Sequence, residues 1–201
     1  MKCVECGKGV SRLFEEPVKG NFVLTICENC GKIADKFIEY EYTLICLNLI
    51  LCKSQVYRHI LFNTHFCMSL LEVAKIWLLN CLLDVIWAGC SEECWDWVLG
   101  KYTAKSLLYF GVILILAWSI EGKVDGLRVI RAILIASFGK LGGFMIVTWN
   151  YSFFHRATMM FFIYLNQVIA IKECLEIGAL KAFGFVVLAG VVSSLNEFGV
   201  F

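Results

Sequence analysis

The chain has 201 residues, of which 60% are hydrophobic and only 17% are charged. Soluble globular domains average about 45–50% apolar and about 25% charged residues, so a core of this size cannot enclose so many apolar side chains. The composition therefore indicates an integral membrane protein. The net charge of +1 gives no electrostatic footprint for nucleic acid, which we exclude as a partner.

Residues 1–41 are the polar part of the chain, and we predict that they form a separate head. They begin with MKCVEC and contain no apolar run of the kind found in cleaved signal peptides. We therefore expect that a later internal helix, rather than a cleaved signal, inserts the chain into the membrane.

Four cysteines of the head form two Cys-x-x-Cys pairs separated by twenty residues. They are Cys3, Cys6, Cys27 and Cys30. Four thiolates suit the tetrahedral coordination of zinc, and Gly7 and Gly31 can take the left-handed conformation that such turns need. The run FVLTI at 22–26 predicts a strand before the second pair. We predict a zinc ribbon whose Zn²⁺ is structural, because four thiolates leave no open position; disulfides or redox pairs are the alternative.

Residues 42–65 form a connecting segment. Its first eleven residues, 42–52, are apolar but too short to span a membrane, which takes about 20 residues. We expect an interfacial or re-entrant helix, the alternative being a helix buried in the head. The basic and aromatic stretch that follows supplies candidates for contact with a lipid phosphate or a partner, plain interfacial anchoring being the alternative. These candidates are Lys53, Tyr57, Arg58, His59 and Asn63.

Residues 66–201 are predicted to form an all-α polytopic bundle of four or five transmembrane helices. The apolar segments are residues 66–90, 104–120, 130–149, 157–171 and 177–195. The third and fifth are the clearest, whereas the first contains charged residues and the fourth is short. The distribution of lysine and arginine between the predicted loops favours a cytosolic head.

Ionisable residues within these segments are candidates for a functional site. Glu72 and Lys75 are three residues apart and could pair, whereas Asp84 and Lys140 have no partner nearby in the sequence. Ionisable groups in a bilayer usually face a bundle interior or a wet cavity, so a polar lipid path is one interpretation. Snorkelling, or a wrongly placed span boundary, is the other.

Small residues and cysteines in the apolar segments suggest packing. Gly139 and Gly143 form a Gly-x-x-x-Gly motif, which allows close helix approach. Five further cysteines are expected to fill apolar space. These are Cys46, Cys52, Cys67, Cys81 and Cys174. Cys90 and Cys94 flank an acidic loop, where a lumenal disulfide is an alternative to free thiols.

Three blocks in order, the cysteine pairs, ADKFIEYE at 34–41 and LILCKSQVYRHILFN at 49–63, resemble the Arv family (ACAT-related protein required for viability). Weaker similarity continues through residues 137–140 and 148–150. The resemblance implies a multi-pass protein of the endoplasmic reticulum membrane. It also implies a role in sterol and sphingolipid homeostasis and in the supply of glycosylphosphatidylinositol (GPI) precursors.

We expect the protein not to be an enzyme, because the sequence contains no His-Glu-x-x-His, no His-x4-Asp and no glycine-rich phosphate loop with lysine. The first hypothesis is a lipid-homeostasis factor that binds or moves membrane lipids: sterols, sphingolipids or GPI precursors. The second is a membrane scaffold whose zinc head recruits a lipid or GPI biosynthetic enzyme.

Overall fold

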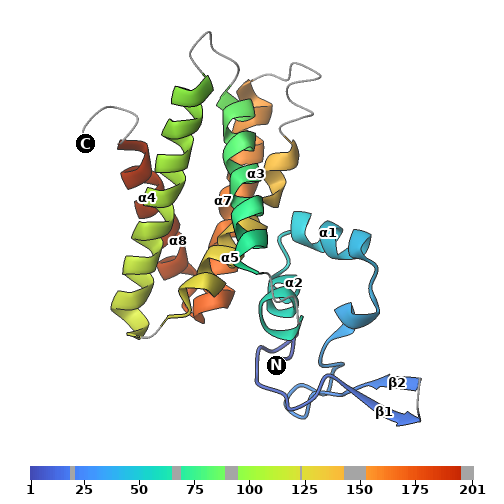
Figure 1. Cartoon of the computed structure of the whole chain (residues 1–201). Helices are drawn as coiled ribbons and strands as arrows, with labels where there is room; N and C mark the ends of the chain where they lie inside the picture. The colour runs from blue at the N-terminus through green and yellow to red at the C-terminus, as the bar shows by residue number, and fades with distance from the viewer. Residues whose placement is uncertain (19–20, 65–68, 89–94, 123, 143–152, 196–201) are drawn as a thin grey trace. The chain divides into compact units, whose positions relative to one another are not determined.

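The computed structural model describes residues 1–18, 21–64, 69–88, 95–122, 124–142 and 153–195 (Figure 1). The chain divides into two compact units, Met1–Cys67 and Met68–Phe201. The connecting segment 42–65 therefore folds with the cysteine-containing head, and the bundle forms the second unit.

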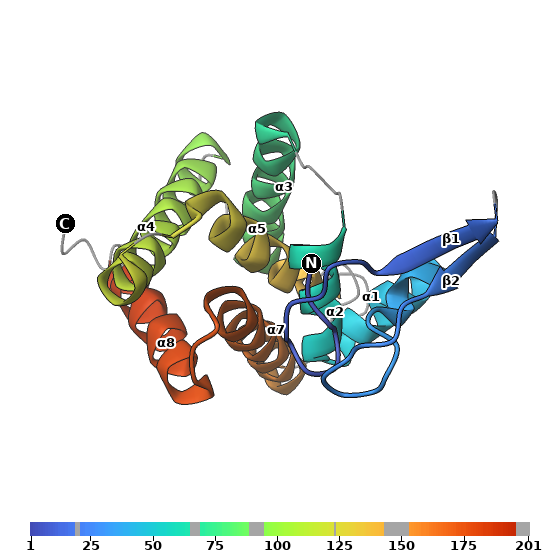
Figure 2. The same cartoon turned by 90° about the horizontal axis from the view of Figure 1, so that it is seen from below.

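The head contains a small antiparallel sheet of two strands, β1 (Phe14–Val18) and β2 (Asn21–Leu24) (Figure 2). Phe14 pairs with Leu24, and the register is irregular between Glu15 and Val18. The strand predicted at 22–26 is thus confirmed over its first part. Beyond the sheet, the amide of Thr25 donates to the carbonyl of Leu13, which extends the pairing towards the second cysteine pair.

Four short helical elements complete the first unit. They are η1 (Lys36–Glu39, a 3₁₀ helix), α1 (Tyr42–Ile50), α2 (Ser54–Arg58) and η2 (His59–Asn63, a π-helix). The chain reverses between α1 and α2 at Cys52, which has φ +55°. The buried part of α1 is Leu49, whereas Leu44, Leu47 and Ile50 are exposed. This apolar exposure differs from that of a helix buried in the head, and contact of α1 with a membrane surface stays a prediction.

The second unit is helical. Its elements in the described residues are α3 (Leu70–Ala88), α4 (Trp95–Glu121), α5 (Gly126–Ala136), η3 (Ser137–Gly142, a 3₁₀ helix), α7 (Phe153–Leu175) and α8 (Ala179–Leu195). α4 packs against α3 and α8, and α7 packs against α5 and α8. Figure 1 shows α3 and α4 running side by side, and Figure 2 shows α5 between α3 and α7. Residues of α3, α4, α5, α7 and α8 line one interior cavity.

Two helices are long and apolar enough to cross a membrane, Trp97–Ile120 and Ala157–Leu175, in the part of the chain that the structure describes. Four or five spans are therefore not confirmed. The predicted third span, 130–149, is interrupted, since α5 ends at Ala136 and a 3₁₀ helix follows. Gly139 and Gly142 lower helix propensity at this point. The predicted fifth span corresponds to α8, whose apolar part, Ala179–Ser194, is shorter than a full span.

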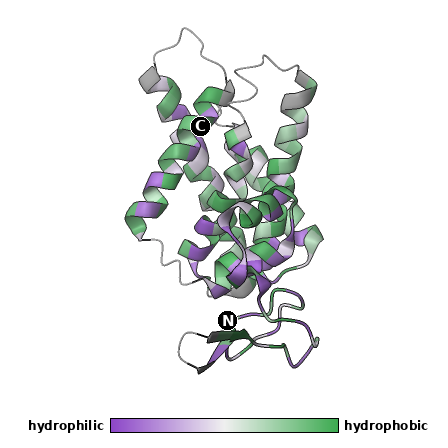
Figure 3. Ribbon diagram, turned by 90° about the vertical axis from the view of Figure 1, so that its right-hand side faces the viewer, coloured by the Kyte–Doolittle hydropathy of each residue, from purple (hydrophilic) through white to green (hydrophobic). Residues whose placement is uncertain are grey.

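Hydrophobic residues make up much of the helices of the second unit (Figure 3). On α4, Leu107, Ile115 and Trp118 each expose more than half of their surface, and on α8 Leu180 is 88% exposed. Contiguous apolar surface of this kind needs a partner other than water. The arrangement therefore fits a bundle surrounded by lipid.

Candidate functional site

The four predicted cysteines converge in the head. Their sulfurs all lie within 4.8 Å of one another, with Cys3 Sγ 3.7 Å from Cys30 Sγ and Cys6 Sγ 3.8 Å from Cys27 Sγ. A tetrahedron of thiolates at the usual Zn–S distance of about 2.3 Å separates its sulfurs by about 3.8 Å. The cluster is therefore compatible in size and donor type with a four-coordinate zinc site.

Both cysteine pairs lie in loops with the same backbone pattern. In the first, the amide of Cys3 donates to the carbonyl of Lys8, and the amide of Gly7 donates to the carbonyl of Cys3. In the second, Cys27 and Gly31 repeat these bonds, with Lys32 as the acceptor for Cys27. The glycines have φ +77° and +68°, so the left-handed conformation predicted for both is confirmed.

The environments of the thiols differ. Burial raises the pKa of the Cys3 thiol to about 12, whereas a hydrogen bond from the backbone of Lys8 lowers the pKa of Cys6 to about 6. Cys3 and Cys27 are buried with Leu13 and Ala34, which form a small apolar core behind the cluster. Two of the four cysteines therefore belong to the small hydrophobic core of the head.

A buried carboxylate, Asp35, joins the head to the π-helix η2. Its Oδ2 lies 2.7 Å from His59 Nδ1 and accepts a hydrogen bond of 2.7 Å from Asn63 Nδ2, while its Oδ1 accepts from the amide of Phe37. Asp35 is fully buried, and His59 and Asn63 are nearly so. Asn63 also bonds to both the backbone amide and the carbonyl of Lys2.

Arg58 forms hydrogen bonds with the backbone of the first cysteine loop. Its guanidinium donates to the carbonyls of Val4 and Glu5, at 2.9 and 2.8 Å. The Glu5 carboxylate accepts from Lys36 at 2.9 Å and from Gln55 at 3.0 Å. The hydrogen bond from Lys36 holds the pKa of Glu5 below its usual range. The basic stretch is thus bonded to the polypeptide that holds the cysteines.

Four of the five residues that were candidates for contact with a lipid or a partner are bonded or buried within the first unit. Tyr57 is 1% exposed, and burial raises the pKa of its phenol. His59 and Asn63 face Asp35, and Arg58 faces the cysteine loop. Lys53 is the exposed candidate of the five. Contact of this stretch with lipid or a partner stays a prediction. Its observed contacts are with other residues of the first unit.

Asp35, Glu5 and Gln55 were not predicted as site residues. The one local signal for Asp35 is its position before the KFIE turn, where aspartate is a favoured N-cap. The sequence offers no signal for the bond from Gln55 to Glu5, which are 50 residues apart. Sequence patterns report spacing along one element, and these contacts join separate elements.

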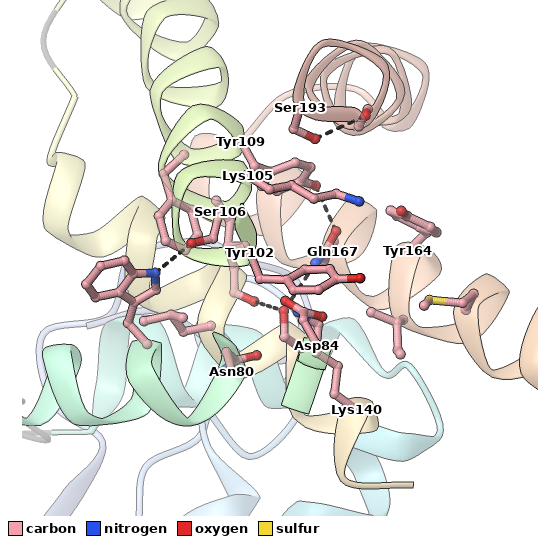
Figure 4. A pocket seen from close by; sticks show the side chains of 18 residues that line it. Asn80, Asp84, Tyr102, Lys105, Ser106, Tyr109, Lys140, Tyr164, Gln167 and Ser193 are labelled. Atoms are coloured by element: carbon pink, nitrogen blue, oxygen red, sulfur yellow. Dashed lines mark hydrogen bonds and ion pairs between the residues drawn. The ribbon is translucent and has the colours of Figure 1, made fainter. Parts of the chain in front are cut away.

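The second unit contains a polar cavity of about 340 Å³ among α3, α4, α5, η3, α7 and α8 (Figure 4). Asp84 and Lys140, the two ionisable residues without a local partner, both line it and form an ion pair of 2.9 Å. Their side chains are 23% and 16% exposed. The expectation that these groups face the bundle interior agrees with this arrangement.

Hydrogen bonds link the walls of the cavity. The Tyr109 hydroxyl donates to Gln167 Oε1 at 2.7 Å, and Gln167 Nε2 donates to Ser137 Oγ at 3.1 Å. Trp77 Nε1 donates to Ser106 Oγ at 2.8 Å. Asn80 donates to the carbonyl of Ile76, and its buried Oδ1 has no hydrogen-bond partner among the described residues. Figure 4 shows Asn80 of α3, Tyr109 of α4 and Gln167 of α7 around the cavity.

An apolar groove of about 600 Å³ lies between α7 and α8. It is lined by side chains such as Phe161, Val168 and Phe183. Tyr164 and Gly190 line both the groove and the polar cavity. The two spaces are therefore neighbours that share a wall.

The other predicted features of the bundle have mixed outcomes. Glu72 does not pair with Lys75; its carboxylate accepts from the amide of Ser69, whose hydroxyl accepts from the amide of Glu72. This is a capping box, which satisfies the free amides at the start of α3. Gly139 packs closely against α7, because a Cβ there would lie 3.1 Å from Ile163 Cγ1.

Further predictions concern cysteines and the second glycine of the motif. Cys81 and Cys174 are buried, as expected of apolar fillers, whereas Cys46 and Cys52 are half-buried. Four residues with predicted roles lie outside the described residues. They are Cys67, Cys90, Cys94 and Gly143.

Fold and site together define a class: a helical membrane protein with a four-cysteine, ribbon-like head. Comparison with known proteins narrows this class. The model of the Arv1-like family matches residues 2–171, so the chain belongs to that family. Proteins of this family are known in general terms for lipid homeostasis in the endoplasmic reticulum, and the predicted resemblance is confirmed.

Relatives match over most of the chain. It is 28% identical to Protein ARV1 of Homo sapiens over 95% of this chain and 78% of the relative. It is 28% identical to Protein arv1 homolog of Dictyostelium discoideum over 93% of this chain and 89% of the relative. Protein ARV 2 of Arabidopsis thaliana is 49% identical over 61 residues, which are 30% of this chain and 27% of the relative. No solved structure matches the chain significantly.

Proposed function

We propose that the protein is a non-enzymatic mediator of intracellular lipid transport and homeostasis in the endoplasmic reticulum membrane, acting on sterols, sphingolipids or GPI precursors. The observation that supports this most is the Asp84–Lys140 ion pair in the wall of a cavity. Charged groups are costly in a bilayer and mark paths for polar groups. Family membership supports the same function.

In this proposal the cavity provides a polar route for the part of a lipid that cannot enter hydrocarbon. Asp84 and Lys140 compensate each other's charge while the route is empty. Tyr109, Gln167 and Ser137 offer a chain of hydrogen-bonding groups across the bundle. A lipid head could exchange water for these groups without remaining unsatisfied.

We assign a structural role to the cysteine cluster, with one Zn²⁺ held by Cys3, Cys6, Cys27 and Cys30. Four thiolates fill the coordination sphere, so the ion would support folding rather than chemistry. A head on the cytosolic side would keep these thiols reduced. Through their hydrogen bonds, Asp35 and Arg58 would couple the folding of the zinc site to the folding of α2 and η2.

A scaffold is the second candidate, and exposed apolar residues of the head favour it. Phe22, Val23 and Ile26 each expose more than half of their surface, and Phe14 exposes 45%. An apolar patch on a small head is a common feature of protein interaction sites. In this version the head recruits a lipid or GPI biosynthetic enzyme and the bundle is an anchor.

Replacing the second unit with a foreign membrane anchor distinguishes lipid transport from the scaffold function. Residues 1–67 are fused to a foreign multi-pass anchor and expressed in cells that lack the endogenous protein, with the full chain as the positive control. Transport through the bundle predicts that the fusion does not restore lipid distribution. Restoration by the fusion would contradict transport and support the scaffold.

A further inference from the structure

We infer that the hairpin of the head, β1 and β2, inserts the side chains of its second strand into the surface of the bilayer. This contact is separate from the apolar helices of the second unit and independent of the proposed transport function. The occupant is the lipid surface itself, which takes up apolar side chains without selecting one lipid species. The structural basis is a strand that exposes apolar side chains on both of its faces.

Both faces of β2 are open. Side chains alternate between the two faces of a strand. Phe14 pairs with Leu24, and its ring contacts that of Phe22 edge-on at 5.4 Å, so these three side chains share one face. Val23 pairs with Glu15 and therefore lies on the other face. Phe22 is 58% exposed and Val23 is 53% exposed, which shows that neither face is covered there by the described residues.

The apolar surface continues beyond the end of β2, whereas β1 is acidic. Ile26 and Ile33 face each other in an antiparallel bridge, and both are exposed. Residues 21–26, NFVLTI, contain no charge, whereas Glu15 and Glu16 of β1 are exposed. A hairpin with its β2 edge towards lipid and its β1 edge towards water places each strand in the medium that suits it.

The two-sided exposure favours a bilayer over a protein partner or a second copy of the chain. A protein packed on one face of the hairpin would leave the other face in water, whereas lipid surrounds an inserted side chain. At about 200 Å² for a large side chain, the four most exposed residues of the hairpin offer roughly 400 Å². A stable protein interface takes about 800 Å² per partner, and here the smaller area is divided between two faces.

The covalent tether to the second unit keeps the head within reach of lipid. Thr64 and Ser69 are five residues apart, which limits their separation to at most about 18 Å. Leu70 and Leu71, in the first turn of α3, are both strongly exposed, so the apolar surface of the second unit begins directly after this tether. A tethered contact forms at a high effective concentration, so a small apolar surface is sufficient.

The backbone of the hairpin limits the depth of insertion. The sheet has two strands, so β2 has a paired neighbour on one edge within it. Backbone groups without partners are costly in hydrocarbon, whereas water and headgroups can bond to them at the membrane surface. We therefore expect the side chains to enter the boundary of headgroups and acyl chains, about 5–10 Å deep, as for interfacial helices.

Fluorine NMR of the full, zinc-loaded chain in phosphatidylcholine nanodiscs tests this contact. A trifluoromethylphenylalanine replaces Phe22 in one sample and the buried Phe37 in another. Paramagnetic broadening is measured with a lipid nitroxide near the headgroup, a lipid nitroxide at the acyl-chain end, and a water-soluble gadolinium chelate. We expect the headgroup nitroxide to broaden the signal at Phe22 most, and several-fold more than the signal at Phe37.

Two other results would overturn the inference. Broadening of the Phe22 signal by the gadolinium chelate alone would show a hairpin in water, free for the enzyme partner of a scaffold. Protection from all three agents in a chain that elutes as a dimer would show a second copy on the hairpin. Transport is measured separately, so either result leaves the transport proposal intact.

A charge in the inserted surface provides the variant test. Ile26→Glu should lower the broadening of the Phe22 signal by the headgroup nitroxide several-fold, because a carboxylate resists entry into lipid. Ile38→Glu is the control, since Ile38 is also exposed but lies on η1, outside the hairpin. Resistance of residues 1–67 to limited proteolysis shows that each variant is folded, and Val23→Gln replaces Ile26→Glu if that variant is not. Equal broadening in the hairpin variant and its control would contradict insertion.

Discussion

Lys140 Nζ lies 2.9 Å from the carboxylate of Asp84, although the two residues are 56 positions apart in the chain. The pair joins α3 to η3, the short helix that follows α5. A charged group without a partner is costly inside an apolar bundle. The ion pair therefore explains how both charged side chains are tolerated in the bundle.

Removal of one member of the pair should destabilise the second unit. Asp84→Ala leaves Lys140 without its carboxylate, and we expect a loss of about 1–3 kcal/mol in the free energy of unfolding. The reversed pair, Asp84→Lys with Lys140→Asp, should recover most of this loss. Thermal unfolding in detergent measures the effect. Equal destabilisation by the single and reversed variants would show that the pairing is unimportant.

The cysteine cluster should bind one zinc per chain, as measured by elemental analysis of the purified protein. Cys27→Ser should abolish this binding and make residues 1–67 sensitive to limited proteolysis, because a small head without its metal lacks a sufficient core. Cys46→Ser is the control, since Cys46 lies on α1 outside the cluster. A head that stays protease-resistant after chelation would contradict the assignment.

Asp35 should be essential to the order of the head. Asp35→Ala leaves the amide of Phe37, His59 and Asn63 without their shared acceptor, so we expect a loss of about 3 kcal/mol. Asp35→Asn keeps an oxygen acceptor and should cost less. Protease sensitivity of residues 1–67 reports the effect in the full chain, with exposed Glu39→Ala as control. An Asp35→Ala head as resistant as the control would argue against the network.

Arg58 should stabilise the first cysteine loop rather than act only as a membrane anchor. Arg58→Lys loses the planar guanidinium that donates to Val4 and Glu5, so zinc should leave faster in the presence of a chelator. Lys53→Ala removes an exposed positive charge from the same stretch and should leave the release rate unchanged. If both variants release zinc at the rate of the unmodified chain, the contact has no such role.

The zinc-compatible cluster could be predicted from the sequence because its information is local. Two residues between cysteines fix each loop, and Gly7 and Gly31 mark the left-handed positions. The role of the basic stretch could not be predicted in the same way. An arginine beside an aromatic residue looks the same before a membrane as it does against a backbone carbonyl, and Arg58 meets its partners 53 and 54 residues away.

The bundle shows the same limit. The five apolar segments of the sequence indicate helices. Hydropathy does not reveal, however, that α5 gives way to a 3₁₀ helix at Ser137. Nor does it pair Asp84 with Lys140 or bring Tyr109 to Gln167, 58 residues later. Polar residues in spans could be nominated from the sequence, whereas their grouping around one cavity required the tertiary structure.

Lipid translocation by the purified, zinc-loaded protein in liposomes tests the central claim most directly. A labelled GPI precursor and a labelled sterol are followed with the unmodified chain, Asp84→Ala, the reversed pair and Lys181→Ala, an exposed lysine of α8 outside the cavity. The account predicts movement above empty liposomes that Asp84→Ala loses and Lys181→Ala keeps. No movement of either lipid by the folded, unmodified chain would contradict it.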